Sequence, residues 1–321
     1  MTLTLKFPAA PLLPPDRQPK NPHYELVALN DGGLPDTYTV TQVHDCISNK
    51  ARGMRRVYRI TMVSEAMNQT RDFVCKVAFG MRYFEVLKEE AMLYEGKLES
   101  LCGQAVPMYY GFFMGETYEG RTGILILEDC GRPLRVPIRR QPLYFRYHLL
   151  HALIQVHHAG VDLEDFGVHN VVVTKDPDPS RADKHIPVII DFSNAKKHKC
   201  LYNDELVAYS VMPYPSLVPC SELWRAFMEA EIFYPRVVTF FSTDVPIEYL
   251  QSVELLKAKG NPPDWMPQDR IDRVAYRVCK DHRDWWAARK ALDEGSVRFG
   301  CARMAHCCGP CDECGLYPTT G

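Results

Sequence analysis

A short connecting segment gathers ionisable side chains between two apolar stretches. Residues 160–173 read GVDLEDFGVHNVVV, and they link an apolar segment to three consecutive valines. Asp165 and Asn170 are separated by four residues within this connection. Short polar side chains at a turn often bond the local backbone. Taken alone, Asp165 and Asn170 therefore predict a turn as readily as a functional site.

Lys76 and Asp191 extend this pattern toward phosphate and metal chemistry. Lys76 lies in the strand-like stretch FVCKVA, where a buried cation needs an acidic partner, and the helical pattern that follows offers Glu89, Glu90 and Glu95. Asp191 follows a second apolar stretch. An aspartate and an asparagine on one loop, opposite another aspartate, present the oxygen ligands that divalent ions prefer. With a lysine to meet phosphate oxygens, the set predicts Mg-nucleotide chemistry.

Composition limits the class of protein and its partners. The 321 residues are 46% hydrophobic and 24% charged, which predicts a large core in two lobes or domains. A net charge of -2 gives no electrostatic reason to expect nucleic acid or an acidic membrane surface as a partner. The sequence has no apolar run of about 18 residues and no secretory signal pattern at its start, so we expect an intracellular protein, cytoplasmic or nuclear.

The first half of the sequence is predicted to be rich in strands. Residues 1–35 are too rich in proline and glycine for a continuous element, and they predict an irregular N-terminal arm. The patterns that follow predict an antiparallel hairpin and then a helix and two strands. These segments are residues 57–63, 72–79, 83–101, 106–114 and 122–128.

The second half is predicted to be mainly helical. A mostly buried helix is expected over residues 142–159 and a hairpin with a polar tip over residues 171–193, with helical patterns from about Asp204 onward. The fold class is therefore α+β. We expect a small antiparallel-sheet N-lobe with its hinge over 36–131, a larger and mainly helical C-lobe over 132–300, and a cysteine-rich tail over 301–321.

The order of these features resembles the protein kinase-like superfamily over roughly residues 40 to 235. Lys76 matches the lysine of the V-A-I-K strand, LEDFGVHN (163–170) aligns with the H-R-D catalytic loop, and IDFSN (190–194) aligns with D-F-G. The phrases EEAMLY, GQAVPMYYGFF, HHAGV and IDFSNAKKHKC are similar to a divergent group of kinase-like proteins abundant in fungi. The resemblance implies a two-lobed kinase-like fold that binds ATP with Mg2+.

The resemblance also implies roles for the charged residues. Lys76 would hold the α- and β-phosphates, with Glu90 as the first choice for its ion-pair partner and Glu89 as the second. Asp165 would be the catalytic aspartate, which orients the acceptor hydroxyl and accepts its proton. Asn170 and Asp191 would be the magnesium ligands, Asp191 being the principal one.

The adenine and phosphates would be held by two further segments. ILILEDCG (124–131) is similar to the hinge, with Leu127 at the gatekeeper position and Glu128 to Cys130 presenting backbone groups to adenine. Counted back from Val57, the positions that are glycines in the phosphate-covering loop are here Lys50, Arg52 and Arg55, with only Gly53 nearby. Side-chain cations would therefore replace the close backbone cradle that glycines permit.

The catalytic loop also departs from the kinase pattern. Leu163 and Glu164 stand where histidine and arginine are usual, and no A-P-E sequence follows Ser193. Because a glutamate cannot bind a phosphorylated activation segment, we do not expect activation by loop phosphorylation. His169, four residues after Asp165, is a candidate donor to the transferring phosphoryl group.

Three functions remain open on these grounds. The first is an ATP-dependent, Mg-assisted phosphotransferase that acts on a protein or small-molecule hydroxyl. The second is a pseudokinase that serves as a binding or scaffold protein, favoured by the missing glycines and the exchanged residues of the catalytic loop. The third is a small-molecule kinase similar to the aminoglycoside or choline phosphotransferases, favoured by the absent A-P-E element.

The C-terminal sequence HCCGPCDECG suggests a separate metal site. Cys308, Cys311 and Cys314 have the spacing of zinc ligands, with His306 and Cys307 beside them. A terminal segment with this composition is also typical of a frayed or redox-labile tail. Seven other cysteines are scattered singly through apolar or amphipathic segments and are predicted to be reduced core thiols. They are Cys46, Cys75, Cys102, Cys130, Cys200, Cys220 and Cys279.

Overall fold

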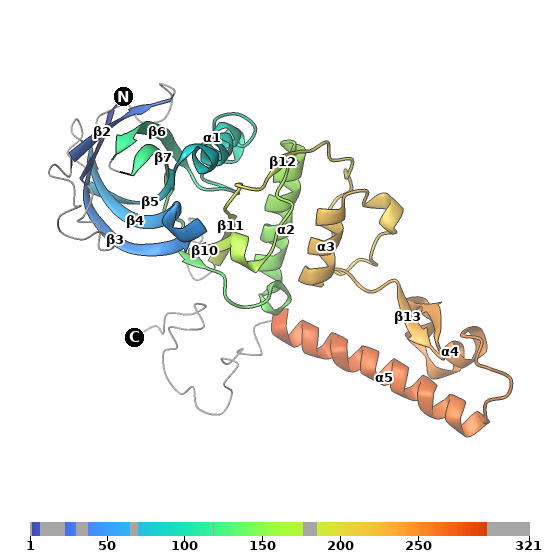
Figure 1. Cartoon of the computed structure of the whole chain (residues 1–321). Helices are drawn as coiled ribbons and strands as arrows, with labels where there is room; N and C mark the ends of the chain where they lie inside the picture. Colours follow the sequence, from blue (N-terminus) through green and yellow to red (C-terminus); the bar gives the residue numbers. More distant parts are fainter. Residues whose placement is uncertain are drawn as a thin grey trace, which may run out of the picture. The chain divides into compact units, whose positions relative to one another are not determined.

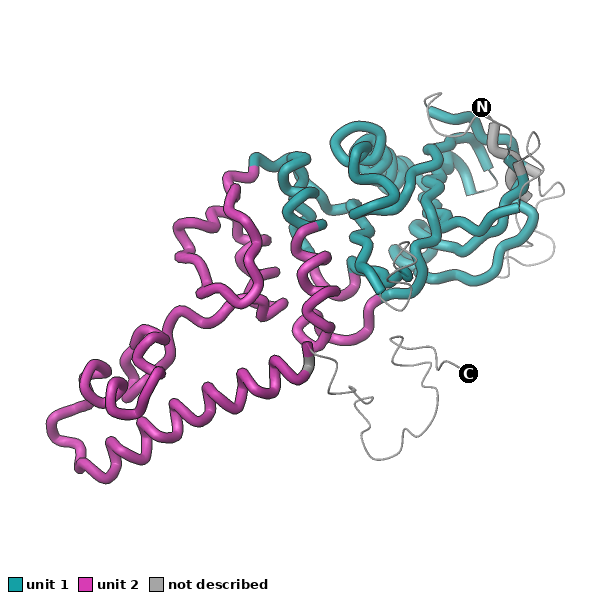
Figure 2. The backbone as a smooth tube through the Cα atoms, turned by 180° about the vertical axis from the view of Figure 1, so that it is seen from behind, with its two compact units in different colours: residues 1–133, 152–166, 170–199 teal, residues 134–151, 167–169, 200–321 magenta. Residues whose placement is uncertain are grey.

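The computed structural model describes residues 2–6, 23–29, 38–64, 70–117, 119–175 and 185–293. Over these residues the chain is α+β, with a largely antiparallel sheet and five α-helices. It divides into two compact units, coloured separately in Figure 2. Unit 1 comprises residues 1–133, 152–166 and 170–199, and unit 2 comprises residues 134–151, 167–169 and 200–321. None of the described helices is long and apolar enough to cross a membrane.

A closed barrel forms the larger part of unit 1 (Figure 1). Its strands follow the order β1-β2-β6-β7-β5-β4-β3. Neighbouring strands are antiparallel except for β1 and β3, which are parallel and close the barrel. Their bounds are β1 Thr2–Lys6, β2 His23–Ala28, β3 Tyr38–Lys50, β4 Arg55–Ser64, β5 Thr70–Phe79, β6 Tyr109–Thr117 and β7 Gly120–Glu128. Three register shifts along β3 fit the strong curvature that a barrel requires.

The expectation of an irregular arm over residues 1–35 is wrong for β1 and β2. Strand β1 (TLTLK) has the polar-apolar alternation of a strand, and it pairs with both β2 and β3. Six of the seven prolines in residues 1–35 stand between the two strands, within residues 7–22, which lie outside the described residues. Composition averaged over 35 residues therefore concealed two short strand patterns.

The two faces of β5 have different neighbours. Phe73, Cys75 and Val77 belong to the barrel core. Because successive side chains of a strand point to opposite faces, Lys76 points away from that core. Helix α1 (Met81–Glu95) packs on β5 and β7, and it buries Glu90 beside the apolar residues of its inner face. The strand-strand-helix-strand-strand order predicted for residues 57–128 is thus present as β4, β5, α1, β6 and β7.

The remaining segments of unit 1 form small sheets. Strand β10 (Val171–Lys175) pairs with β11 (His185–Ile189) on one side and with β8 (Arg132–Pro133) on the other. Strands β9 (Val161–Asp162) and β12 (Lys196–Lys197) pair antiparallel. The hairpin predicted over residues 171–193 is therefore present, and its polar tip, residues 176–184, lies outside the described residues.

These pairings explain why unit 1 extends beyond the expected boundary at residue 131. Strand β10 pairs with β8 directly after that boundary, and the Ile189 N–H donates a hydrogen bond to the Ala105 carbonyl at 2.9 Å. Residues 152–166 and 170–199 consequently cluster with the barrel and not with the mainly helical part. The division differs in this respect from the predicted lobes, 36–131 and 132–300.

Unit 2 is built around helices. Helix α2 (Leu143–His158) begins in unit 2 and ends in unit 1. The other helices are α3 (Ser221–Ala230), α4 (Val253–Lys259) and α5 (Gln268–Asp293). Arg146 is fully buried, donates to the Ala230 and Glu231 carbonyls and pairs with Asp293 at 2.6 Å, so its charge is compensated.

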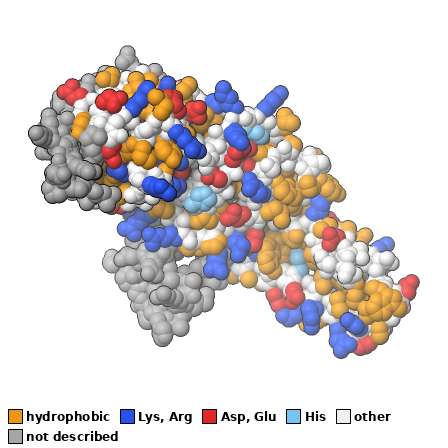
Figure 3. Space-filling model, viewed as in Figure 1, with side chains coloured by type: hydrophobic (Ala, Val, Ile, Leu, Met, Phe, Trp, Pro, Cys, Tyr) orange, Lys and Arg blue, Asp and Glu red, His pale blue; other side chains and the backbone are white. Residues whose placement is uncertain are grey.

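One part of the predicted helical region is a hairpin. Strands β13 (Val237–Phe240) and β14 (Thr243–Pro246) pair antiparallel, where the composition VVTF favours a strand. In Figure 3 apolar side chains gather over the part of unit 2 that carries β13, α4 and α5. The exposed apolar residues there include Val237, Trp265, Tyr276 and Trp285.

The scattered cysteines are placed differently from one another. Cys75, Cys130, Cys220 and Cys279 are buried, as predicted for core thiols. Cys46, on β3, is exposed and is therefore not a core thiol, while Cys102 and Cys200 are half-buried. The cysteine-rich tail, with Cys308, Cys311 and Cys314, lies outside the described residues.

Candidate functional site

Lys76 joins two carboxylates inside unit 1. Its Nζ lies 2.7 Å from Glu90 Oε1 and 2.9 Å from Asp191 Oδ1. Strand β5 supplies the lysine, helix α1 supplies Glu90, and Asp191 follows strand β11. Glu90, the first choice from sequence, is buried and makes this contact, whereas Glu89 is exposed. A lysine on the outer face of the barrel is thereby neutralised by two acids from elements far apart in sequence.

The three charges shift one another's pKa. The ammonium of Lys76 holds the pKa of Asp191 well below its usual range. Burial lowers the pKa of Lys76, but Glu90 and Asp191 outweigh that effect and leave its pKa raised. Burial raises the pKa of Glu90, against the opposing effect of Lys76. Lys76 and Asp191 are therefore ionised at neutral pH.

The backbone around Asp191 is held in a specific conformation. Asp191 has a φ of 65°, in the left-handed region that is costly for a residue with a Cβ. The Ile190 N–H donates to the Asn170 carbonyl at 2.8 Å, and the Phe192 N–H donates to Glu90 Oε1 at 3.1 Å. The Phe192 ring also packs edge-on against Tyr94 of α1. These contacts maintain the strained residue and direct its carboxylate toward Lys76.

Asn170 and Asp165 lie beside Asp191. Asn170 Nδ2 donates to Asp165 Oδ1 and to the Asp191 carbonyl, both at 3.4 Å. Asn170 is 1% exposed, and its Oδ1 has no hydrogen-bond partner among the described residues. A buried amide oxygen without a donor is costly unless a ligand supplies the missing interaction.

The oxygen set fits a divalent cation. Asn170 Oδ1 is buried without a partner, and Asp191 carries an ionised carboxylate. Carboxylate and amide oxygens are the ligands that Mg2+ takes, together with water and phosphate oxygens. Asn170 and Asp191 are thus two residues of unit 1 that could hold a divalent cation such as Mg2+.

Asn194 is a site residue that the sequence reasoning did not identify. Its Nδ2 donates to Asp165 Oδ2 at 2.9 Å, so each oxygen of that carboxylate has an amide donor. Asn194 stands three residues after Asp191 in IDFSN, but no spacing rule connects it to Asp165. Only the folded chain brings them together.

The predicted phosphate loop is a tight cationic turn between β3 and β4. Ala51, Arg52 and Gly53 all have positive φ, from 54° to 88°. Lys50 Nζ lies 3.9 Å from Asp191 Oδ2, while the Arg52 side chain is exposed. Val57, on β4, is directly opposite Lys76 in the strand pairing. The turn thus brings the Lys50 ammonium near Asp191, the candidate metal ligand, without a run of glycines.

The predicted hinge continues from β7. Leu127 is buried, and the Glu128 N–H donates to the Met108 carbonyl at 2.9 Å, so this amide is already in use. Cys130 packs with Val172 and Val188 in a small apolar cluster, and burial raises the pKa of its thiol. Of the expected adenine-facing backbone groups, the Glu128 N–H is therefore not open to a ligand.

Gly131 fixes the path of the chain after Cys130. Its φ is 101°, and a Cβ at this position would lie 2.3 Å from the Val173 carbonyl oxygen. The Arg59 guanidinium donates to the Gly131 carbonyl at 2.8 Å and to Asp129 Oδ2 at 2.7 Å. A glycine is required here because strand β10 approaches its backbone closely.

His169 is not brought into this set within unit 1. It is exposed and belongs to the short 167–169 segment of unit 2. Its role as a donor to a phosphoryl group stays a prediction. The possible zinc ligands Cys308, Cys311 and Cys314 lie outside the described residues.

Comparisons of the sequence with models of known protein families and with curated proteins found no match.

Proposed function

We propose that the chain is a Mg-assisted, ATP-dependent phosphotransferase with a two-lobed protein kinase-like fold. The observation that carries the proposal is the meeting of Lys76, Asp191 and Asn170 in unit 1, with Lys76 Nζ 2.9 Å from Asp191 and Asn170 Oδ1 buried without a partner among the described residues. A cation for phosphate oxygens and two oxygen ligands for a metal are the groups that phosphoryl transfer needs.

Each residue has a distinct role in this proposal. Lys76 binds the α- and β-phosphates, and Glu90 keeps its ammonium in position. Asp191 and Asn170 would hold Mg2+, which neutralises charge on the phosphate oxygens when bound. The acceptor hydroxyl attacks the γ-phosphorus as the bond to the β-phosphate oxygen breaks, and Asp165 takes the hydroxyl proton. The amide donors Asn170 and Asn194 orient the Asp165 carboxylate for this step.

Calorimetric titration with ATP, with and without Mg2+, tests the nucleotide site. We expect Mg-dependent binding that is lost in Lys76→Ala and Asp191→Ala and retained in Lys175→Ala, which changes an exposed lysine of β10. Absence of binding at millimolar ATP, or equal binding by all three variants, would contradict the proposal.

A transfer assay then tests catalysis separately from binding. Asp165→Asn should bind Mg-ATP as the unaltered chain does, yet transfer phosphoryl groups at least about 100-fold more slowly, since general-base assistance contributes this much. Incubation with peptides and with small alcohols in parallel would identify the acceptor class. Phosphorylation of small alcohols alone would favour the aminoglycoside or choline kinase type.

The second candidate is a nucleotide-independent scaffold of the pseudokinase type. The specific observation that favours it is the ion pair of Lys50 with Asp191 at 3.9 Å, because a cation at that carboxylate competes with a metal. In a scaffold whose metal site is occupied by Lys50, Mg-ATP binding would be absent from the unaltered chain, and Lys50→Ala would not weaken it. In a phosphotransferase whose turn holds phosphates, the same change would weaken Mg-ATP binding without abolishing it.

A further inference from the structure

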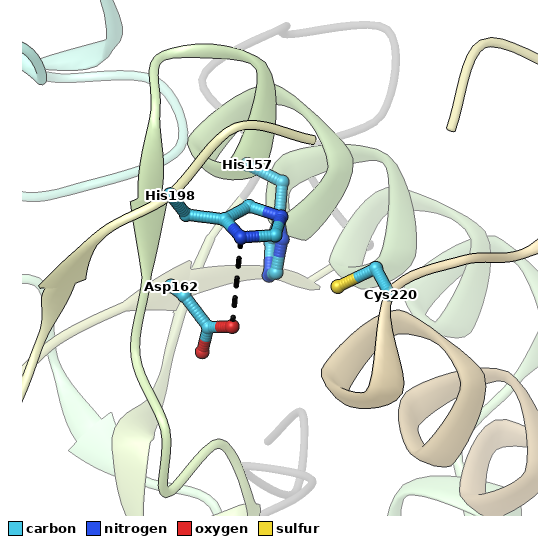
Figure 4. A group of neighbouring side chains, drawn as sticks. All are labelled: His157, Asp162, His198 and Cys220. Carbon is cyan, nitrogen blue, oxygen red and sulfur yellow. Dashed lines mark ion pairs between the residues drawn. The ribbon is translucent and has the colours of Figure 1, made fainter. Parts of the chain in front are cut away.

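Two histidines and an aspartate meet in unit 1 on segments that flank the candidate site. His157 lies in the last turn of helix α2, Asp162 lies on β9, and His198 directly follows β12 (Figure 4). One ligand atom from each lies within 4.8 Å of the others. Cys220, also drawn in Figure 4, belongs to unit 2, immediately before α3.

The Asp162 and His198 side chains lie close together without a direct hydrogen bond between them. His198 Nδ1 lies 4.0 Å from Asp162 Oδ2, beyond hydrogen-bond distance. The other ring nitrogen of His198, Nε2, is buried and has no hydrogen-bond partner among the described residues. The rings of His157 and His198 are edge-to-face, with centroids 5.0 Å apart. An imidazole nitrogen left without a partner in a buried position indicates a missing ligand.

The surrounding bonds orient the cluster. The Glu164 N–H donates to Asp162 Oδ1 at 2.8 Å, which directs the second carboxylate oxygen toward His198. The backbone N–H of His198 donates to the Gly160 carbonyl at 3.0 Å, and β9 pairs with β12 beside it. A carboxylate that is itself hydrogen-bonded, as Asp162 is, is typical of metal ligands.

We infer that His157, Asp162 and His198 form a binding site for a transition metal, with Zn2+ the best fit. Two imidazoles and a carboxylate are a common zinc ligand set, and the preference of imidazole for such metals disfavours Mg2+ or Ca2+. His157 is fully buried, while the side chains of Asp162 and His198 are each 21% exposed, so an ion can enter. The ion would connect His157 and Asp162, which precede Asp165 in the sequence, with His198, which follows Asp191.

Metal binding by chelator-treated full-length protein tests this inference. All five tail cysteines, Cys301, Cys307, Cys308, Cys311 and Cys314, are replaced by serine in the same chain to remove them as zinc ligands, and Zn2+ content and Co2+ absorption are then measured. We expect about one ion per chain and a cobalt spectrum typical of nitrogen and oxygen ligands.

Substitutions at the cluster separate it from adventitious binding. Asp162→Asn keeps an acceptor for the Glu164 N–H, and both it and His198→Gln should weaken the metal affinity by more than about tenfold. His158→Gln, which changes the next, exposed residue of the same helix, should leave the affinity unchanged. Two results would overturn the inference. One is the absence of bound metal from the chain whose tail cysteines are serines, and the other is an equal metal affinity in Asp162→Asn, His198→Gln and the control His158→Gln. Neither result depends on ATP binding or phosphoryl transfer.

Discussion

Lys76 Nζ lies 2.7 Å from Glu90 Oε1, and the Glu90 side chain is completely buried. Glu90 Oε1 also accepts the Phe192 N–H, whereas Oε2 has no hydrogen-bond partner among the described residues. The carboxylate therefore depends on Lys76 for most of its compensation. A partly satisfied buried acid is costly when its cation is removed.

Removal of the lysine should destabilise the fold more than removal of the pair. Lys76→Met leaves Glu90 buried without a cation, and we expect a loss of roughly 3–5 kcal/mol in the free energy of unfolding. The double variant Lys76→Met, Glu90→Leu should be more stable than Lys76→Met alone, because the completely buried acid is removed together with its cation. Urea unfolding measures both, with Lys175→Met as the exposed control. A double variant that is no more stable than the single one would contradict this reasoning.

Asp191 should make the free energy of unfolding depend on pH in the acidic range. Its pKa is held well below the usual range, so its ionised form stabilises the fold above the ordinary aspartate pKa of about 4. That contribution is lost as the pH falls from the ordinary value toward the lower folded-state value. The unfolding free energy of the unaltered chain should therefore decrease more steeply below about pH 4 than that of Asp191→Asn. Urea titrations over this pH range are the measurement, and Asp264→Asn, an exposed change, should follow the unaltered chain.

Asn194 should act as a positioning residue for Asp165. On the proposed function, Asn194→Leu removes the 2.9 Å donor to Asp165 Oδ2, and a hydrogen bond to a charged group is worth roughly 1.5–3 kcal/mol. The phosphoryl-transfer rate should then fall about tenfold or more while Mg-ATP affinity is retained. Asn194→Asp, which replaces the donor by a like charge, should be slower still and should shift the pH profile upward. Equal losses of rate and nucleotide affinity would point to a structural role instead.

Substitutions at two glycines should distinguish the cost of backbone strain from the cost of a steric clash. Gly120 and Gly131 have φ of 90° and 101°, but a Cβ at Gly120 meets nothing within 4 Å, whereas at Gly131 it would lie 2.3 Å from the Val173 carbonyl oxygen. Gly120→Ala should cost about 1–2 kcal/mol, the penalty for a left-handed conformation. Gly131→Ala should cost clearly more, because β10 must also move. Chemical denaturation of both variants measures the two losses in the free energy of unfolding. Equal losses would contradict the prediction, because they would mean that β10 moves without an energetic penalty.

Local patterns were sufficient to predict much of unit 1. The alternation in residues 57–79 and the helical spacing after Tyr83 predicted β4, β5 and α1 in their order, since each pattern reports which face of a single element is buried. Short strands next to prolines were not predictable in this way. β1 and β2 are held in place by pairing around the barrel, which no local pattern reports.

The sequence by itself determined the types of side chain available for chemistry and the elements that carry Lys76 and Glu90. The tertiary structure decided which of them meet. Lys76 and Asp191 are 115 residues apart, and Asn194 is 29 residues from Asp165, yet each pair is within hydrogen-bond distance. His157, Asp162 and His198 lie on three different segments, and the packing of these segments brings their ligand atoms within 4.8 Å of one another. Periodicity encodes the burial of one face of an element, whereas contacts between distant residues depend on how all the elements pack together.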